Sequence, residues 1–553
     1  MIYKNSLQSD NVSQTQKARA DQVLNAGGGY VFQLDNWKRL DRFLIIGAKK
    51  PSYYEKEETI ARENSMNIME CAKSDVVRAV KRIEEISVSG RAPKNDEAVF
   101  ALAVIFSMTS KKFWKESTPE FAKNASQAVK ASFLQVIRTG THLMQFVDTV
   151  NAYRGWGSSL KKLISQFYNQ DAKSVAYQIA KYGSRENWTT LDVLRKAHVV
   201  PATDEHAAIF QYVAFAETGK KTGSKTQVRK ELTFDSVPRI LRDKTELTKP
   251  EATVKRALQL MSENRAISHE MLAGHLKNDA KVWEKMIMAG MPLTALIRNL
   301  GKISSLGLTK DLSAVTQKIC ADILDVEKLE KARIHPLNVL VAKSVYESGR
   351  GVKGSNSWPA SRQIVSALEQ AFYLSFKTIE KTNKRFLLGI DISGSMGSPI
   401  SDTVPISNAV AAAVMAMATL RVEDNSIIRG FSNQFIDLGI GKEDSLAVAS
   451  AKVQKSNFGP TDASQAIEWA RTNKVPVDCF CIYTDCDVNS GKHVFQTLRD
   501  YRKEMNIDAR LVVAAFQATS YTIADPNDAG MLDLSGFDSA MPNIISQFAT
   551  GMF

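Results

Sequence analysis

Apolar side chains in the first two thirds of the chain recur at helical spacing. Between about residues 60 and 345 they stand at i, i+3, i+4 and i+7, without the alternation typical of strands. The clearest cases are Val129, Phe133, Val136 and Ile137, then Val254, Leu258 and Met261, then Leu293, Leu296, Ile297 and Leu300. Helices of moderate length with short connections predict an irregular α-helical solenoid of the HEAT type, in which neighbours bury each other's apolar faces.

The hydrophobic period changes at Arg385, where short apolar runs begin to alternate with helical stretches. Strands are predicted at 386–390, 426–431, 435–440, 478–483 and 509–518, and helices at 405–420, 463–474 and 493–506. Such alternation is typical of a doubly wound, largely parallel sheet. The glycine-rich stretch 349–356 is predicted to be a loop or hinge before it. A chain of 553 residues is too long for one core, so we expect a helical domain at 1–375 and an α/β domain at 380–553.

The composition is that of an ordinary globular protein, with 44% hydrophobic and 24% charged residues. The first 16 residues lack the apolar segment of a secretory signal, and the longest apolar run, at 409–420, is too short to cross a bilayer. The five cysteines, Cys71, Cys320, Cys479, Cys481 and Cys486, show no zinc-site spacing. We therefore expect a cytoplasmic protein without a membrane association.

The positive charge is concentrated in the helical part. Residues 381–553 contain 15 Lys and Arg against 19 Asp and Glu, a net charge of −4, whereas residues 1–380 contain 57 against 40, a net charge of +17. This asymmetry favours a polyanion partner for the helical domain. A basic excess that only serves solubility is the alternative, and charge alone leaves it open.

Oxygen-bearing side chains follow the first predicted strand of the α/β domain. Asp391, Ser393 and Ser395 stand directly after 386–390, Thr461 follows in a later loop, and Asp485 ends another apolar run. The carboxyl ends of parallel strands are where ligands bind in such sheets. Carboxylate and hydroxyl oxygens suit Mg²⁺ better than softer metals. The alternative is that the two serines only cap the next helix.

Together these five residues resemble the metal-ion-dependent adhesion site of von Willebrand factor A domains. The resemblance implies that Ser393 and Ser395 bind the metal directly, that Asp391, Thr461 and Asp485 bind it directly or through water, and that one position stays open for an acidic ligand. Pro460 stands where that pattern usually has a second glycine before the threonine. Its fixed φ predicts a stiffer loop.

Longer stretches of the sequence resemble the Ro 60-kDa autoantigen family of TROVE-domain RNA-binding proteins. They are residues 29–33, 39–44, 53–54, 181–188, 194–198, 291–302 and 530–538. The resemblance implies a helical ring that the A domain helps to seal, acting as a monomer. It also implies that small non-coding Y RNAs bind the outer basic surface and that 3′ ends of misfolded RNAs enter the central hole. Roles in RNA quality control, and in tethering the exoribonuclease polynucleotide phosphorylase, are implied as well.

The family's Y RNA-binding positions correspond to Lys181, Arg185 and His198. Lys181 and Arg185 are four residues apart, which predicts one shared helical face, although Gly183 between them can loosen that helix. Both side chains can contact phosphate. Trp188 is predicted to be a buried anchor between helices, with stacking on a base as the alternative.

No catalytic constellation accompanies these motifs. The lysine-rich stretch 219–226 fails the spacing of a phosphate-binding loop and is predicted to be a basic surface loop near RNA, with a merely mobile loop as the alternative. We therefore expect a non-enzymatic RNA-binding protein. Two alternatives are an A-domain adaptor that grips an acidic protein ligand through Mg²⁺ and a metal-dependent nuclease.

Overall fold

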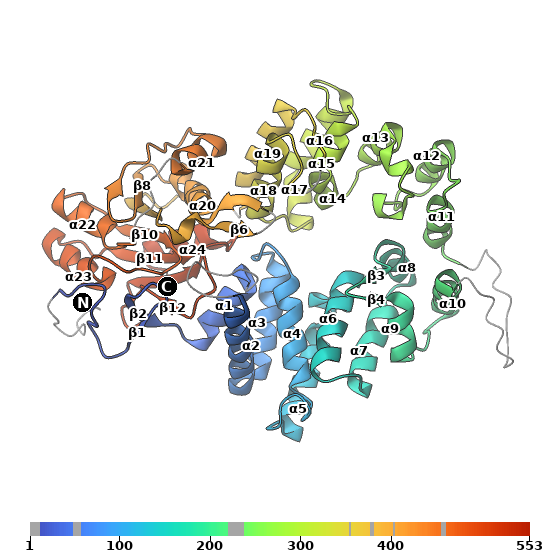
Figure 1. Cartoon of the computed structure of the whole chain (residues 1–553), viewed down its shortest axis with the longest axis horizontal. Helices are drawn as coiled ribbons and strands as arrows, with labels where there is room; N and C mark the ends of the chain where they lie inside the picture. The colour runs from blue at the N-terminus through green and yellow to red at the C-terminus, as the bar shows by residue number, and fades with distance from the viewer. Residues whose placement is uncertain are drawn as a thin grey trace.

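The computed structural model describes residues 11–47, 57–218, 237–352, 355–376, 381–401, 404–454 and 460–552. The predicted basic loop at 219–226 lies outside these residues. Helices run around an opening, and an α/β body stands at one side (Figure 1). Within the described residues, no helix is both long and apolar enough to cross a membrane.

The helical part is the predicted irregular solenoid. Its helices are α1 (Asn36–Ile46), α2 (Glu57–Ser74), α3 (Val76–Ser89), α4 (Asp96–Ser107), α5 (Pro119–Val136), α6 (Gly140–Tyr153), α7 (Ser158–Tyr168), α8 (Ala172–Lys181), α9 (Thr190–Ala197), α10 (Asp204–Thr218), α11 (Arg239–Leu247), α12 (Val254–Glu263), α13 (Ala280–Met288), α14 (Leu293–Arg298), α15 (Leu300–Ser305), α16 (Ala314–Leu324), α17 (Val326–Lys331), α18 (Pro336–Glu347) and α19 (Arg362–Leu374). Many begin at a Thr, Ser or Asp whose side chain accepts a backbone N–H of the first turn, as Thr118 and Thr139 do for α5 and α6. Val129, Phe133 and Val136 are fully buried, as their spacing predicts.

The second part is the predicted doubly wound sheet. Its strands are β5 (Phe386–Asp391), β8 (Ser426–Phe431), β9 (Phe435–Ile436), β10 (Cys479–Thr484), β11 (Arg510–Ala515) and β13 (Met531–Ser535), in the order β13-β11-β10-β5-β8-β9. All neighbours are parallel except β8 and β9. The helices are α20 (Asn408–Val422), α21 (Leu446–Gln454), α22 (Gln465–Thr472), α23 (Val494–Met505) and α24 (Met541–Thr550).

Successive residues of β10 enter two different cores because side chains alternate along a strand. Cys479, Cys481 and Tyr483 pack in the cluster that contains α20 and α24. Phe480 and Ile482 pack in the cluster that contains α22 and α23. Both faces of the sheet are therefore covered, which explains why the strands read as continuous apolar runs.

Three predicted boundaries in the α/β part are wrong by three residues or more, and one of them is the end of the strand predicted at 509–518, which ends at Ala515. The helix predicted from residue 405 begins at Asn408, because Val404–Ser407 (β7) pairs as a hairpin with Pro399–Ser401 (β6) and Ser407 then caps the helix. The strand predicted at 435–440 ends at Ile436, because β9 is a two-residue antiparallel edge. A strand ends where its pairing with the neighbouring strand ends, and the hydrophobic pattern of one strand does not reveal that point.

A β-hairpin that precedes the solenoid in sequence joins the α/β body in space. Strands β1 (Gln22–Leu24) and β2 (Tyr30–Gln33) pair with each other, and β2 also pairs with β12 (Tyr521–Thr522). Val31 and Phe32 are buried in the same core as α22 and α23. The expected division at 375–380 remains a prediction, and the structure adds that residues 22–33 belong spatially with the second body.

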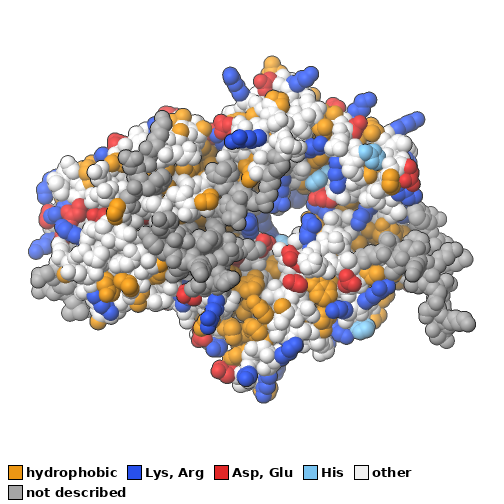
Figure 2. Space-filling view, viewed as in Figure 1, with side chains coloured by type: hydrophobic (Ala, Val, Ile, Leu, Met, Phe, Trp, Pro, Cys, Tyr) orange, Lys and Arg blue, Asp and Glu red, His pale blue; other side chains and the backbone are white. Residues whose placement is uncertain are grey.

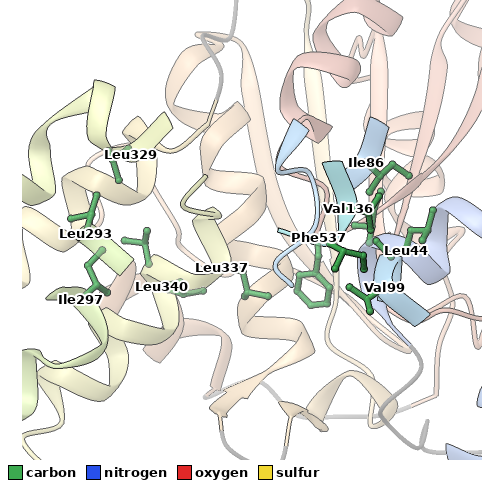
Figure 3. Packing of buried hydrophobic residues seen from close by; sticks show 14 of the residues in the cluster. Leu44, Ile86, Val99, Val136, Leu293, Ile297, Leu329, Leu337, Leu340 and Phe537 are labelled. Atoms are coloured by element: carbon green, nitrogen blue, oxygen red, sulfur yellow. The ribbon is translucent and has the colours of Figure 1, made fainter. Parts of the chain in front are cut away.

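The two ends of the solenoid meet at the α/β body. Arg91, between α3 and α4, donates from Nε (3.1 Å) and from a terminal nitrogen (2.5 Å) to Asp538, in the loop before α24. His335, at the start of α18, places Nε2 3.1 Å from the Arg91 carbonyl oxygen and 2.7 Å from that of Phe537. In Figure 3 the Phe537 ring lies between Leu337 and Val99, and all three are buried in one core. This junction closes the circuit of helices.

An opening remains in the middle of the circuit. Figure 2 shows it, with Lys and Arg side chains and a few acidic ones at its rim. On the far side from the junction the circuit continues through α8, which packs against α11. The architecture is therefore a helical ring in which the α/β body takes part.

Candidate metal centre and RNA-binding surface

The five predicted metal ligands lie at the carboxyl edge of the central sheet. Strands β5 and β10 are parallel neighbours with Ile390 opposite Tyr483. Asp391 therefore lies beside Thr484, and Asp485 follows directly. Asp391, Ser393, Ser395, Thr461 and Asp485 are each at most 2% exposed. Serines that only capped a helix would not need two buried carboxylates beside them.

Hydrogen bonds hold the first carboxylate in place. Asp391 Oδ1 accepts the Ser393 N–H at 2.9 Å, and its Oδ2 accepts the Thr484 hydroxyl at 2.5 Å. Ser393 Oγ and Ser395 Oγ are 3.2 Å apart. Ser395 also hydrogen-bonds Asp485. Four of the predicted residues are thus joined in one polar cluster.

Thr461 belongs to the neighbouring loop. Its N–H donates to Asn489 Oδ1 at 2.9 Å, and its carbonyl oxygen accepts the Asn489 N–H at 3.1 Å. This connects Thr461 to the segment that follows Asp485. Pro460, which breaks the usual glycine pattern, precedes it without preventing this contact.

The electrostatics of the cluster fit a divalent cation. Burial, followed by the nearby Asp485 carboxylate, raises the pKa of Asp391 to about 7. Burial also raises the pKa of Asp485. Within the described residues neither carboxylate has a Lys or Arg partner, and Asp485 Oδ2 has no hydrogen-bond partner. Two buried carboxylates without a counter-ion are costly unless a cation compensates them.

The donor set is one of hard oxygens, which suits Mg²⁺. No group of three or more His, Cys, Asp and Glu side chains suited to a metal occurs in the described part of the chain. Two carboxylates would therefore need the hydroxyls of Ser393, Ser395 and Thr461 to complete the coordination. The residues present fit such a cation.

Asp487 is a further buried acid, two residues after Asp485. Its N–H donates to Asp485 Oδ1 at 3.0 Å. Its own Oδ1 accepts the hydroxyl of Tyr521, on β12. Asp487 thus ties the loop after β10 to the strand that pairs with the N-terminal hairpin.

Lys181, the first predicted RNA-binding residue, ends α8 and is largely covered. Its side chain is 13% exposed, and Nζ lies 3.7 Å from Glu270 Oε1. The ammonium also stands over the Tyr177 and Tyr182 rings, at 5.7 and 5.3 Å. These contacts give Lys181 a structural role beside any contact with RNA.

Arg185 does not share a helical face with Lys181, so that prediction is wrong. Helix α8 ends at Lys181, and Arg185 lies on β3 (Ser184–Arg185), which pairs with β4 (Trp188–Thr189). Glu186 and Asn187 between the strands both have positive φ, 50° and 60°. This is the conformation of a tight hairpin turn. The turn presents the exposed Arg185 to solvent.

His198 caps α9 in the left-handed conformation and is exposed, as are Arg195 and Lys196. Lys196 Nζ stands 4.8 Å from the centre of the Trp188 ring. Trp188 is 9% exposed and donates from Nε1 to Asp148 at 3.0 Å, which confirms it as a buried anchor. We define the α8–α9 surface as Lys181, Arg185, Arg195, Lys196 and His198.

Two family models match the chain. One, described as the TROVE domain, matches residues 23–345. The other, described as the Ro60 vWA domain, matches residues 385–549. Together they cover both bodies of the fold.

Full-length relatives agree with these matches. A protein of Caenorhabditis elegans named RNA-binding protein RO60 is 32% identical over 595 residues, which covers 97% of this chain and 91% of that protein. A protein of Deinococcus radiodurans with the same name is 33% identical over 547 residues, covering 98% of each. The crystal structure of the Deinococcus radiodurans RO (RSR) protein superposes with a TM-score of 0.66 at 31% identity, covering 94% of this chain and all of that one.

Proposed function

The chain belongs to the Ro60 family, and from that premise we propose that it is a non-catalytic, monomeric ring that binds RNA in the cytoplasm. Small Y-like RNA would bind the α8–α9 surface, and 3′ ends of misfolded RNA would enter the central opening. The protein would act in RNA quality control or decay, with tethering of an exoribonuclease such as polynucleotide phosphorylase as one route.

The observation that carries the proposal is the exposed basic group on the α8–α9 surface, within residues 1–380, whose net charge is +17. Arg185 on its hairpin turn can pair with a phosphate in bidentate fashion. His198, Arg195 and Lys196 stand together at the end of α9. A cluster of this kind supplies the backbone contacts that position an RNA.

We expect Arg185→Ala to weaken binding of a small structured RNA about tenfold, with the slope of log affinity against log salt falling by about one. Lys181→Ala should weaken it less, because Lys181 is mostly covered and paired with Glu270. Filter binding at several salt concentrations measures both quantities. Lys130→Ala, which removes one exposed charge on α5, is the matched control. Equal affinity and slope for Arg185→Ala and wild type would contradict the assignment of this surface.

The α/β body carries a second proposed site, an Mg²⁺ centre formed by Asp391, Ser393, Ser395, Thr461 and Asp485. The bound cation would supply an open coordination position for a carboxylate of a protein ligand. The two buried carboxylates, which have no basic partner among the described residues, support this role. A docking adaptor is therefore the second candidate function, and it is compatible with RNA binding elsewhere on the ring.

We expect Asp391→Ala to abolish binding of Mg²⁺ or Mn²⁺ while RNA affinity stays within about twofold of wild type, because phosphate contacts come from other residues. Calorimetry with Mn²⁺ measures the metal affinity, and filter binding measures the RNA affinity. Asp437→Ala, which removes an exposed carboxylate of the same body, is the control. Mg²⁺-dependent degradation of RNA by pure protein, lost in Asp391→Ala, would instead establish a nuclease.

A further inference from the structure

The segment that carries Asp485 holds a strained residue. We call residues 484–488 the metal loop. Cys486, in its centre, has a φ of +69°, in the left-handed region that residues with a side chain rarely adopt. Such a conformation persists only when the surroundings fix it. The residues that fix it come from the other end of the chain.

Asn25, in the turn between β1 and β2, holds the metal loop directly. Its Nδ2 donates to the carbonyl oxygens of Cys486 (3.1 Å) and Val488 (2.8 Å). Its Oδ1 accepts the Gly29 N–H at 2.7 Å. Asn25 is 4% exposed. One buried amide therefore sets the direction of two peptide groups, the first of them in the residue next to Asp485.

The turn and the loop are in backbone contact. A Cβ on Gly27 would lie 2.8 Å from the Asp487 carbonyl oxygen, and a Cβ on Gly29 would overlap the Val488 carbonyl oxygen. Gly28 between them has a φ of +95° and faces open space. The turn of residues 25–29, which we call the N-terminal turn, can thus approach the metal loop because its contacting positions have no side chain.

Short contacts lead from this turn to the metal-binding oxygens. The Cys486 N–H donates to Thr484 Oγ1 at 3.1 Å, and that hydroxyl donates to Asp391 Oδ2 at 2.5 Å. On the other side of Cys486, Asp485 Oδ1 accepts the Asp487 N–H, and Asp485 Oδ2 has no hydrogen-bond partner in the part of the chain that the structure describes. A change in the Cys486 peptide would therefore move both carboxylates.

We propose that Asn25 is a positioning residue of the metal centre, and that the affinity of the A-domain site for a divalent cation depends on the N-terminal turn. The inference rests on the proposed function at one point, that a cation binds between Asp391 and Asp485. Asn25 does not touch that cation. It holds the strained backbone that aims Asp485.

The first test compares Asn25→Ala with Gln22→Ala in the full-length protein, titrated with Mn²⁺ by calorimetry. Gln22 is a buried amide of the same hairpin, but its side chain bonds His493 (3.2 Å), the backbone N–H groups of residues 18 and 19 and the Tyr30 carbonyl oxygen (3.5 Å), and not the metal loop. Asn25→Ala is expected to weaken Mn²⁺ binding about 10- to 100-fold, as is usual for residues that orient ligands. Gln22→Ala should bind Mn²⁺ as wild type does. Equal Mn²⁺ affinity in the two variants would overturn the inference.

The second test uses two neighbouring glycines. Gly29→Ala places a methyl group against Val488 and is expected to weaken Mn²⁺ binding as Asn25→Ala does. Gly28→Ala puts alanine at a positive φ, which strains the turn, but its methyl group has no described atom within 4 Å. Gly28→Ala should therefore keep the Mn²⁺ affinity of wild type. Loss of Mn²⁺ affinity in Gly28→Ala alone would overturn the inference.

A readout without metal separates this inference from the proposed site. Hydrogen exchange of the peptide that spans residues 484–490 should be faster in Asn25→Ala than in Gln22→Ala, because the loop loses its anchor. Unchanged exchange would overturn the positioning role whatever the metal does. If wild type binds no Mn²⁺ but exchange rises in Asn25→Ala, the metal site is overturned while the anchoring of the loop stands.

Discussion

Replacing Asp533 with alanine should lower the free energy of unfolding by about 3–5 kcal/mol. Asp533 lies on β13, and its carboxylate is 2.5 Å from the guanidinium of Arg42 on α1. The Arg42 side chain is 2% exposed, so the loss of Asp533 would leave a buried charge without a counter-ion. Its other nitrogen donates to the carbonyl oxygens of Thr519 (3.1 Å) and Tyr521 (2.7 Å), which do not supply a charge. Urea denaturation monitored by circular dichroism measures the change.

Two controls separate the buried charge from the lost contact. The double variant Arg42→Met with Asp533→Leu removes both charges, and it should recover most of the stability that Asp533→Ala loses. Asp424→Ala breaks exposed pairs with Lys381 and Lys442 and should change stability little, because water and salt screen those pairs. A double variant as unstable as Asp533→Ala would show that packing, and not the unpaired charge, decides the effect.

The metal edge of the sheet could be predicted because its signal is local. A strand shows itself as an apolar run, and the residues that follow a parallel strand lie at one edge of the sheet. Asp391 and Asp485 each stand at the end of such a run. Predicting that the two carboxylates lie close together therefore required only the assumption that β5 and β10 are adjacent. The pairing of Ile390 with Tyr483 confirms that assumption.

The supporting contacts of that edge could not be predicted, because they join distant parts of the chain. Asn25 bonds the carbonyl of Cys486, 461 positions away. Arg42 bonds Asp533, 491 positions away. Asn25 stands in no motif. Arg42 lies in the stretch 39–44 that resembles the family, but a polar residue between apolar ones gives no indication of its partner. Pairings of this kind follow from the closed ring, which has no local signature.

The error at Arg185 has a local cause. Spacing of four residues implies a shared face only where the helix continues, and α8 ends at Lys181. The sequence did contain a contrary signal. Thr189 and Asp192 form a capping box that starts α9, so the residues before Thr189 had to be a connection between two helices.

Acidification should weaken the junction that closes the ring, through His335. Its Nδ1 accepts the Leu337 N–H at 3.0 Å, so the proton must sit on Nε2, which faces the Arg91 and Phe537 carbonyl oxygens. A second proton would have to bind Nδ1, where it would clash with the Leu337 N–H. Burial lowers the pKa of His335 from 6.5 to about 4, so the native state favours the neutral ring. This contribution to stability is complete above pH 6.5 and is lost as the pH falls towards 4.

Between pH 7 and pH 4.5, His335 should cost the folded protein about 2 kcal/mol. Urea denaturation at the two pH values measures the total change, to which His142, with a pKa lowered to about 4 by burial, also contributes. His335→Gln keeps an N–H donor and cannot be protonated, so its pH dependence should be smaller than that of wild type by about 2 kcal/mol. His275→Gln, which alters an exposed imidazole, is the matched control. If the free energy of unfolding of His335→Gln depends on pH as strongly as that of wild type, the acid-sensitive group is not His335, and protonation does not weaken the junction.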